Sequence, residues 1–110
     1  MTAETDQRLL REQFHEAMLD IYRRALAEAD YSATRFLRML NDHGGLETAQ
    51  ILLHRLTVSE GYTALYLKKR LDLTVEAVIH DHNKWHPLFT REELDVCVNR
   101  LRDYGYLNPV

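Results

Sequence analysis

The chain has 110 residues and a formal net charge of −3; 45% of the residues are hydrophobic and 28% are charged. This length and composition fit one ordered domain with its own core and exclude a disordered chain. The acidic balance argues against a general polyanion binder, and the single cysteine, Cys97, excludes an intramolecular disulfide. We therefore expect one domain over residues 1–110, in a reducing compartment.

The N-terminal segment from Met1 to Arg11 is polar, and it lacks the basic stretch and the apolar run of a secretory signal. No apolar segment approaches the ~20 residues that are needed to cross a bilayer. We expect a cytoplasmic protein that does not associate with membranes, with residues 1–5 frayed at its start.

Apolar residues recur at steps of three and four along most of the chain, which predicts an all-α fold. The clearest stripe predicts that the first helix is the longest and runs from about Asp6 to Ala29. The stripe consists of Leu10, Phe14, Met18, Ile21, Ala25 and Ala29.

Two shorter helices are expected next, with glycines between them. Ser32 is a typical N-cap residue, and Tyr31 and Phe36 have the spacing of a hydrophobic staple, so the second helix is expected to begin at Ser32. Gly44 can adopt the positive φ that ends this helix. The third helix then starts near Gly45.

A fourth helix is indicated by Thr57 and Glu60, which have the spacing of a capping box. Gly61 weakens its first turn, because glycine has a low helix propensity. The helix ends at a basic triplet, Lys68, Lys69 and Arg70.

The segment Leu73–Ile79 can be interpreted as a helix or a strand. Its apolar residues alternate as in a strand, but Asp72 or Thr74 could cap a short helix. No second strand candidate exists to pair with it, so we expect a helix. Residues 80–89 are then expected to form a loop.

The last helix is marked by Thr90 and Glu93, which form another capping box. Gly105 and Pro109 end this helix and leave residues 106–110 as a tail. The expected architecture is a compact bundle of five or six short-to-medium helices.

Three histidines within seven residues, His80, His82 and His86, form a candidate metal site, and Asp81 lies among them. A metal ion needs three or four ligands that converge on one point. The spacing matches no standard zinc framework, so the alternative is a polar loop with solvated imidazoles. We expect no cofactor.

Large side chains on the helices supply candidates for a partner surface. Tyr62, Tyr66 and Trp85 are of the kind that dominates interface hot spots, although at helical spacing they also serve as core. Cys97 falls on the apolar stripe of the last helix, which favours a buried thiol over a nucleophile.

The Gly44–Gly45 turn has a local likeness to the helix-hairpin-helix motif, with Ala49 four residues after the second glycine. In that family the turn presents N–H groups at a helix N-terminus to a nucleic-acid phosphate. His43 stands where the motif has its first glycine, so an ordinary glycine-capped hairpin is the alternative.

A wider resemblance is carried by several strings of residues. They are Tyr31–Leu37, His43–Glu47, Ser59–Leu65, Arg70–Glu76, Trp85, Leu88–Thr90 and Glu92–Leu94. With this pattern the chain resembles an uncharacterised family of short, all-helical bacterial proteins. The resemblance covers roughly residues 14–106. It implies a free-standing domain of bacterial or phage origin, and it implies no catalytic residues.

These patterns favour a non-enzymatic binding or regulatory module that acts through protein–protein contacts or self-association. The alternative is nucleic-acid binding through Gly44, Gly45 and the basic triplet, whose charges equally complement the end of a helix. A third hypothesis is a metal-dependent enzyme that uses the His80–His86 segment.

Overall fold

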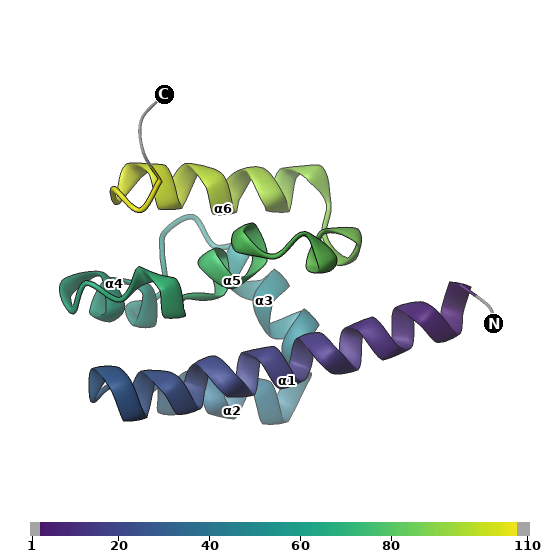
Figure 1. Cartoon of the computed structure of the whole chain (residues 1–110), viewed down its shortest axis with the longest axis horizontal. Helices are drawn as coiled ribbons and strands as arrows, with labels where there is room; N and C mark the ends of the chain where they lie inside the picture. Colours follow the sequence, from purple (N-terminus) through teal and green to yellow (C-terminus); the bar gives the residue numbers. More distant parts are fainter. Residues whose placement is uncertain (1–2, 108–110) are drawn as a thin grey trace.

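The computed structural model describes residues 3–107, which fold into helices joined by short segments (Figure 1). The all-α prediction is confirmed, and the first helix is the longest, as expected. The elements are α1 (Ala3–Ala29), α2 (Thr34–His43), α3 (Gly45–Leu53), α4 (Glu60–Leu67), the 3₁₀ turn η1 (Leu71–Leu73), α5 (Val75–Asp81), the 3₁₀ segment η2 (Asn83–Leu88) and α6 (Arg91–Asp103).

The helices lie in layers around a central α5. Helix α1 packs against α2 and α3, while α5 packs against α6 on the opposite side of the molecule (Figure 1). Helix α4 lies at one end, beside η1 and near the last turns of α1. None of the described helices is long and apolar enough to cross a membrane.

An aromatic cluster fills the centre of the main core. Phe14 is fully buried, and it meets the rings of Trp85 and Phe89 edge-on, with centroids 5.3 and 5.4 Å away. These contacts order the segment that we predicted to be a loop. Residues 80–89 instead contain the end of α5 and the 3₁₀ segment η2, because burying Trp85 and Phe89 outweighs the polar character of the residues between them.

The predicted N-caps are correct for two helices and wrong for two others. Helix α5 begins after Thr74, so Leu73–Ile79 is helical as predicted, and Thr90 and Glu93 form the expected capping box of α6. Helix α2, however, begins two residues after Ser32 and has no side-chain cap. Helix α4 is capped by Ser59 and not by the predicted Thr57. The Ser59 hydroxyl oxygen accepts a hydrogen bond from the Tyr62 N–H at 3.0 Å.

Both ends of the chain are more ordered than we predicted. Helix α1 already includes Ala3, and Tyr106 continues the packed structure beyond α6. The Tyr106 N–H donates to the Leu101 carbonyl at 2.8 Å, and its hydroxyl donates to Asp81 at 2.6 Å. The predictions for residues 1–2 and 108–110 fall outside the described residues.

A buried ion pair joins α5 to α6 and organises the loop between α3 and α4. The Arg100 guanidinium donates to Glu76 at 2.9 Å, and the two side chains are 11% and 4% exposed. The same guanidinium donates to the carbonyls of Leu52, Arg55 and Thr57. Burial raises the pKa of the Glu76 carboxyl, and hydrogen bonds from the backbone and Arg100 limit that rise. Thr57 lies two residues before Ser59, which is the N-cap of α4, so Thr57 does not cap this helix.

We expect Arg100→Met to lower the free energy of unfolding by about 3–5 kcal/mol, because it leaves Glu76 buried without a partner. Urea denaturation measures this loss. The matched control is Arg91→Met on the same helix. Its ion pair with Asp95 is 87% and 61% exposed, and exposed pairs contribute less than about 1 kcal/mol. A similar small loss in both variants would contradict this account.

Candidate functional site

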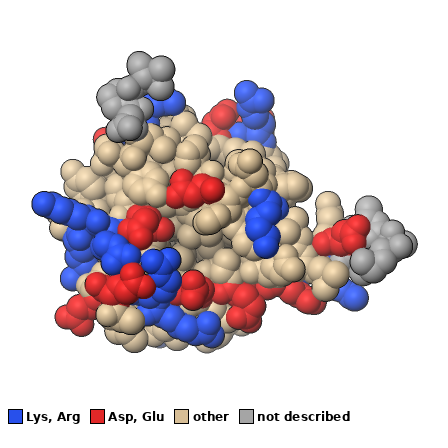
Figure 2. Space-filling view, in the orientation of Figure 1, with Lys and Arg blue, Asp and Glu red and all other residues tan. Residues whose placement is uncertain are grey.

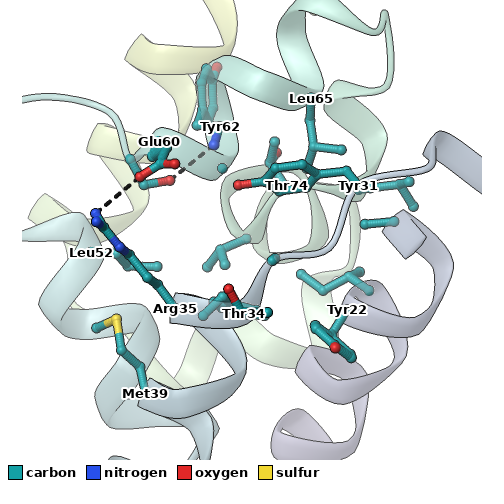
Figure 3. A pocket seen from close by; sticks show the side chains of 18 of the residues that line it. Tyr22, Tyr31, Thr34, Arg35, Met39, Leu52, Glu60, Tyr62, Leu65 and Thr74 are labelled. Atoms are coloured by element: carbon teal, nitrogen blue, oxygen red, sulfur yellow. Dashed lines mark hydrogen bonds and ion pairs between the residues drawn. The ribbon is translucent and has the colours of Figure 1, made fainter.

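A groove opens between the second half of α1, the segment that leads into α2, and the start of α4 (Figure 3). Its volume is about 220 Å³. We call it the Tyr31 groove, after the residue that lies across it. The apolar side chains that line it are Ile21, Ala25, Phe36, Met39, Leu52, Leu65, Leu73 and Val75. The lining is therefore largely apolar, and the charged side chains of Arg35, Arg55 and Glu60 are exposed at its mouth.

The position of Tyr31 follows from the end of α1. Asp30 adopts a φ of 51°, and the Tyr31 N–H donates to the Ala25 carbonyl at 3.0 Å, so the chain turns sharply there. This turn brings the Tyr31 ring across the groove toward the first turn of α4 (Figure 3). Partial burial raises the pKa of the Tyr31 hydroxyl, and the nearby Glu60 carboxylate adds to the rise.

Gly61 forms the wall of the groove opposite Tyr31. It lies within α4 and does not adopt a positive φ, so the backbone does not require a glycine. A Cβ at this position would lie 3.7 Å from the Tyr31 hydroxyl oxygen, which is an ordinary contact distance. Neither strain nor crowding explains a residue of low helix propensity here. Its missing side chain leaves space beside the hydroxyl end of Tyr31.

An ion pair spans the mouth of the groove between α2 and α4. The Arg35 guanidinium donates to Glu60 at 3.1 Å (Figure 3). The two side chains are 87% and 72% exposed. Because such exposed pairs are worth less than about 1 kcal/mol, the mouth opens at little cost. Arg55, on the loop before α4, is a second exposed cation of the lining.

The predicted aromatic partner surface is wrong for two of its three residues. Tyr62 and Trp85 are buried, and the Tyr62 hydroxyl donates to the Arg100 carbonyl at 2.9 Å. Burial raises the pKa of Tyr62 as well. Tyr66 is 42% exposed and packs edge-on against Tyr104. Helical spacing alone could not separate these cases, because a core aromatic and an interface aromatic repeat with the same period.

The two parts of the predicted nucleic-acid site lie far apart. Gly45 packs against His15 near the middle of α1, where a Cβ would lie 2.6 Å from the His15 Cα atom. Arg70 pairs with Glu28 near the end of α1. His15 and Glu28 are separated by about 20 Å along the helix axis. Gly45 thus has a packing role, in allowing α1 and α3 to approach closely.

The basic triplet lies in a region of mixed charge. Arg70 donates to Glu28 at 2.7 Å and to Asp72 at 3.0 Å, and Arg24 donates to Glu28 at 2.8 Å. Figure 2 shows this alternation of basic and acidic side chains at the end of the molecule where α4 and the last turn of α1 lie. Lys69 adopts a φ of 61° as the chain leaves α4. The triplet therefore does not form a uniformly basic patch.

The hollow beside the glycine turn differs from the Tyr31 groove in its lining. It encloses about 780 Å³, and its walls are charged side chains of both signs, with Leu46 as its one large apolar residue. The Nδ1 atom of His15 is buried beside it and has no hydrogen-bond partner among the described residues.

The three histidines of the candidate metal site do not converge. The described part of the chain contains no group of three or more His, Cys, Asp or Glu side chains that could hold a metal ion. The Nε2 atom of His86 lies 2.9 Å from the Ile79 carbonyl oxygen. His80 belongs to α5, and His82 separates α5 from η2. The metal hypothesis placed all three in a loop, whereas in the structure His80 lies in α5 and His86 lies in η2.

Comparisons of the chain with protein-family models, with curated proteins and with solved structures found no match. The groove is therefore interpreted from its own geometry. Sequence reasoning missed Tyr31 and Arg35 as site residues, because it assigned Tyr31 to a staple. The signal at Gly61 was visible as an unexplained glycine in a helix.

Cys97 is buried as predicted, and burial raises the pKa of its thiol to about 12 from an ordinary 9.0. That shift leaves about a thousandth of the usual thiolate at pH 8. We expect a disulfide reagent such as DTNB to label the native protein at least about a hundredfold more slowly than the urea-unfolded chain. Rapid stoichiometric labelling of the native protein would show that the thiol is accessible.

The charge network around Glu28 predicts a specific acid sensitivity. Hydrogen bonds from Arg24 and Arg70 lower the pKa of Glu28 from 4.5 to about 2. A carboxylate with a lowered pKa stabilises the fold above its ordinary pKa, and this contribution is lost as the pH falls. The difference in urea midpoint between the wild type and Glu28→Gln should thus shrink between pH 4.5 and pH 2. Glu16→Gln, at an exposed site, is the control, and an equal pH trend there would refute the assignment.

Proposed function

We propose that this protein is a binding module that takes up one large apolar side chain of a protein partner in the Tyr31 groove. The observation that carries the proposal is the groove itself, with its largely apolar lining and a volume of about 220 Å³. We call the side chain that enters it the anchor.

The size of the groove favours a single side chain over a whole small molecule. An apolar cavity of about 150 Å³ holds a benzene ring, and sites for complete small ligands usually exceed about 300 Å³. The Tyr31 groove falls between these limits. One aromatic or branched aliphatic side chain fills such a space, and burying it contributes about 1.5–3 kcal/mol.

The chemistry of the mouth also suits a peptide segment. Tyr31 places a hydroxyl at the edge of the apolar floor, and its pKa is raised, so it stays a neutral donor. A backbone carbonyl next to the anchor provides the acceptor that such a donor needs. Aromatic residues with a polar tip are typical of interface hot spots.

The proposal is tested by selecting random peptides displayed on phage against the wild-type protein. The selected peptides should share one large apolar residue. Their binding should weaken at least about tenfold in Gly61→Leu, because the new side chain occupies the place of the anchor. Affinity is measured by fluorescence anisotropy with synthetic versions of the selected peptides.

The matched control is Thr63→Leu, which adds the same side chain to an exposed position of α4 outside the groove. It should bind the peptides as the wild type does. Failure to select any peptide, or equal binding to Gly61→Leu, would contradict the proposed function.

Gly61→Ala separates stability from binding. The new methyl group fits at 3.7 Å from Tyr31, and alanine is the better helix former by up to about 1 kcal/mol. We expect this variant to be more stable than the wild type in urea, yet to bind the selected peptides less tightly because the groove is narrower. Lower stability would mean that the glycine has a structural purpose.

A further inference from the structure

The charged side chains that line the Tyr31 groove differ in how accessible they are to a partner. Four charged side chains line the groove: Arg35, Arg55, Glu60 and Glu76. Glu76 is 4% exposed and is bound to Arg100 beneath the floor, so it presents no charge at the surface. Three charges remain at the mouth, two of them positive.

Arg55 combines a fixed backbone with an unengaged side chain. Its carbonyl accepts a hydrogen bond from Arg100 at 2.7 Å, which holds this residue of the loop before α4 in place. Its own side chain is exposed, and it forms no ion pair with any side chain of residues 6–107. The backbone of Arg55 is thus fixed at the rim, and its guanidinium pairs with no carboxylate of residues 6–107.

Arg35 is also available once a partner arrives. Its ion pair with Glu60 is solvent-exposed on both sides, so exchanging Glu60 for another carboxylate costs little. Arginine suits this role, because its planar guanidinium binds carboxylates through two parallel hydrogen bonds. The peptide dipoles of α2 and α4 favour negative charge in the same place, since both helices begin at the groove.

We infer that the partner is an acidic peptide segment, in which a carboxylate beside the apolar anchor is received by Arg55 and Arg35. This inference rests on the proposed function and gives the groove its specificity. The positive mouth stands on a chain with a formal net charge of −3, so the preference is local to this surface. A basic segment would be repelled by the two arginines, and Glu60 is the sole exposed carboxylate of the groove lining that could attract it.

The test uses three short fluorescein-labelled peptides with a central phenylalanine or leucine. In the acidic peptide the residues around it are aspartate and glutamate. In the basic peptide they are lysine and arginine, and in the neutral peptide they are serine and glycine. Anisotropy should show that the acidic peptide binds about tenfold more tightly than the basic one, with the neutral peptide between them. Added salt should reduce this difference.

Two charge-reversal variants distinguish a local effect from a global one. Arg55→Glu should reverse the preference, so that the basic peptide binds more tightly than the acidic one. Arg91→Glu changes the net charge equally at an exposed position of α6 outside the groove, and it should keep the wild-type order. Equal shifts in both variants, or equal binding of the acidic and basic peptides, would overturn the acidic preference while groove binding stands.

The neutral peptide keeps the two proposals distinct. If the neutral peptide binds the wild type and fails to bind Gly61→Leu, the groove takes an apolar anchor, and this conclusion does not depend on the charge preference. If none of the three peptides binds, the proposed function fails, and the inference about acidic partners fails with it.

Discussion

The guanidinium of Arg100 joins three parts of this protein at one point, namely α5, α6 and the chain from the end of α3 to the start of α4. It lies against Glu76 in a nearly dry site, and it also donates to one carbonyl of the last turn of α3 and to two carbonyls of the loop between α3 and α4. A buried charge is tolerated only when its partners satisfy it, so the native fold requires α5, α6 and this loop to meet at Arg100. The start of α4, and with it one wall of the Tyr31 groove, is fixed as a result.

The groove depends on two turns of the chain, one at the end of α1 and one at the start of α4. At the end of α1, Asp30 takes a left-handed φ and sends Tyr31 across the surface of the bundle. At the start of α4, Ser59 caps the helix and places Gly61 opposite that ring. Each turn is a local event, but their meeting requires α1, α2 and α4 to be packed. The site is therefore a property of the tertiary structure, built on ordinary local chemistry.

Much of the fold could be predicted from the sequence because its signals are local. The stripe on α1, the capping box of Thr90 and Glu93, and the positive φ of Gly44 all depend on residues close in the chain. The errors occur where a distant contact decides. Most of residues 80–88 are helical because Trp85 and Phe89 pack on Phe14. The Thr57 carbonyl accepts from Arg100, and Ser59 caps α4 in place of Thr57. Patterns among neighbouring residues do not specify such long-range contacts.

The same limit explains the candidate sites. Tyr62 and Trp85 looked like surface candidates, and the packing around Arg100 and Phe14 buries them. The glycine turn resembled a phosphate site, but Gly45 serves the close approach of α1 and α3. Gly61 was recognised as a weak point of a helix. Its meaning depends on Tyr31, which lies thirty residues earlier in the sequence.

The chain's one sulfhydryl has a practical consequence for solution work. Since Cys97 is enclosed by the core, we expect the native protein to react very slowly with maleimides. A second cysteine placed on the solvent side of α2 or α4 would be the only reactive one in the folded molecule. An environment-sensitive dye or a nitroxide attached there would report whether the Tyr31 groove is occupied, without removal of the native cysteine.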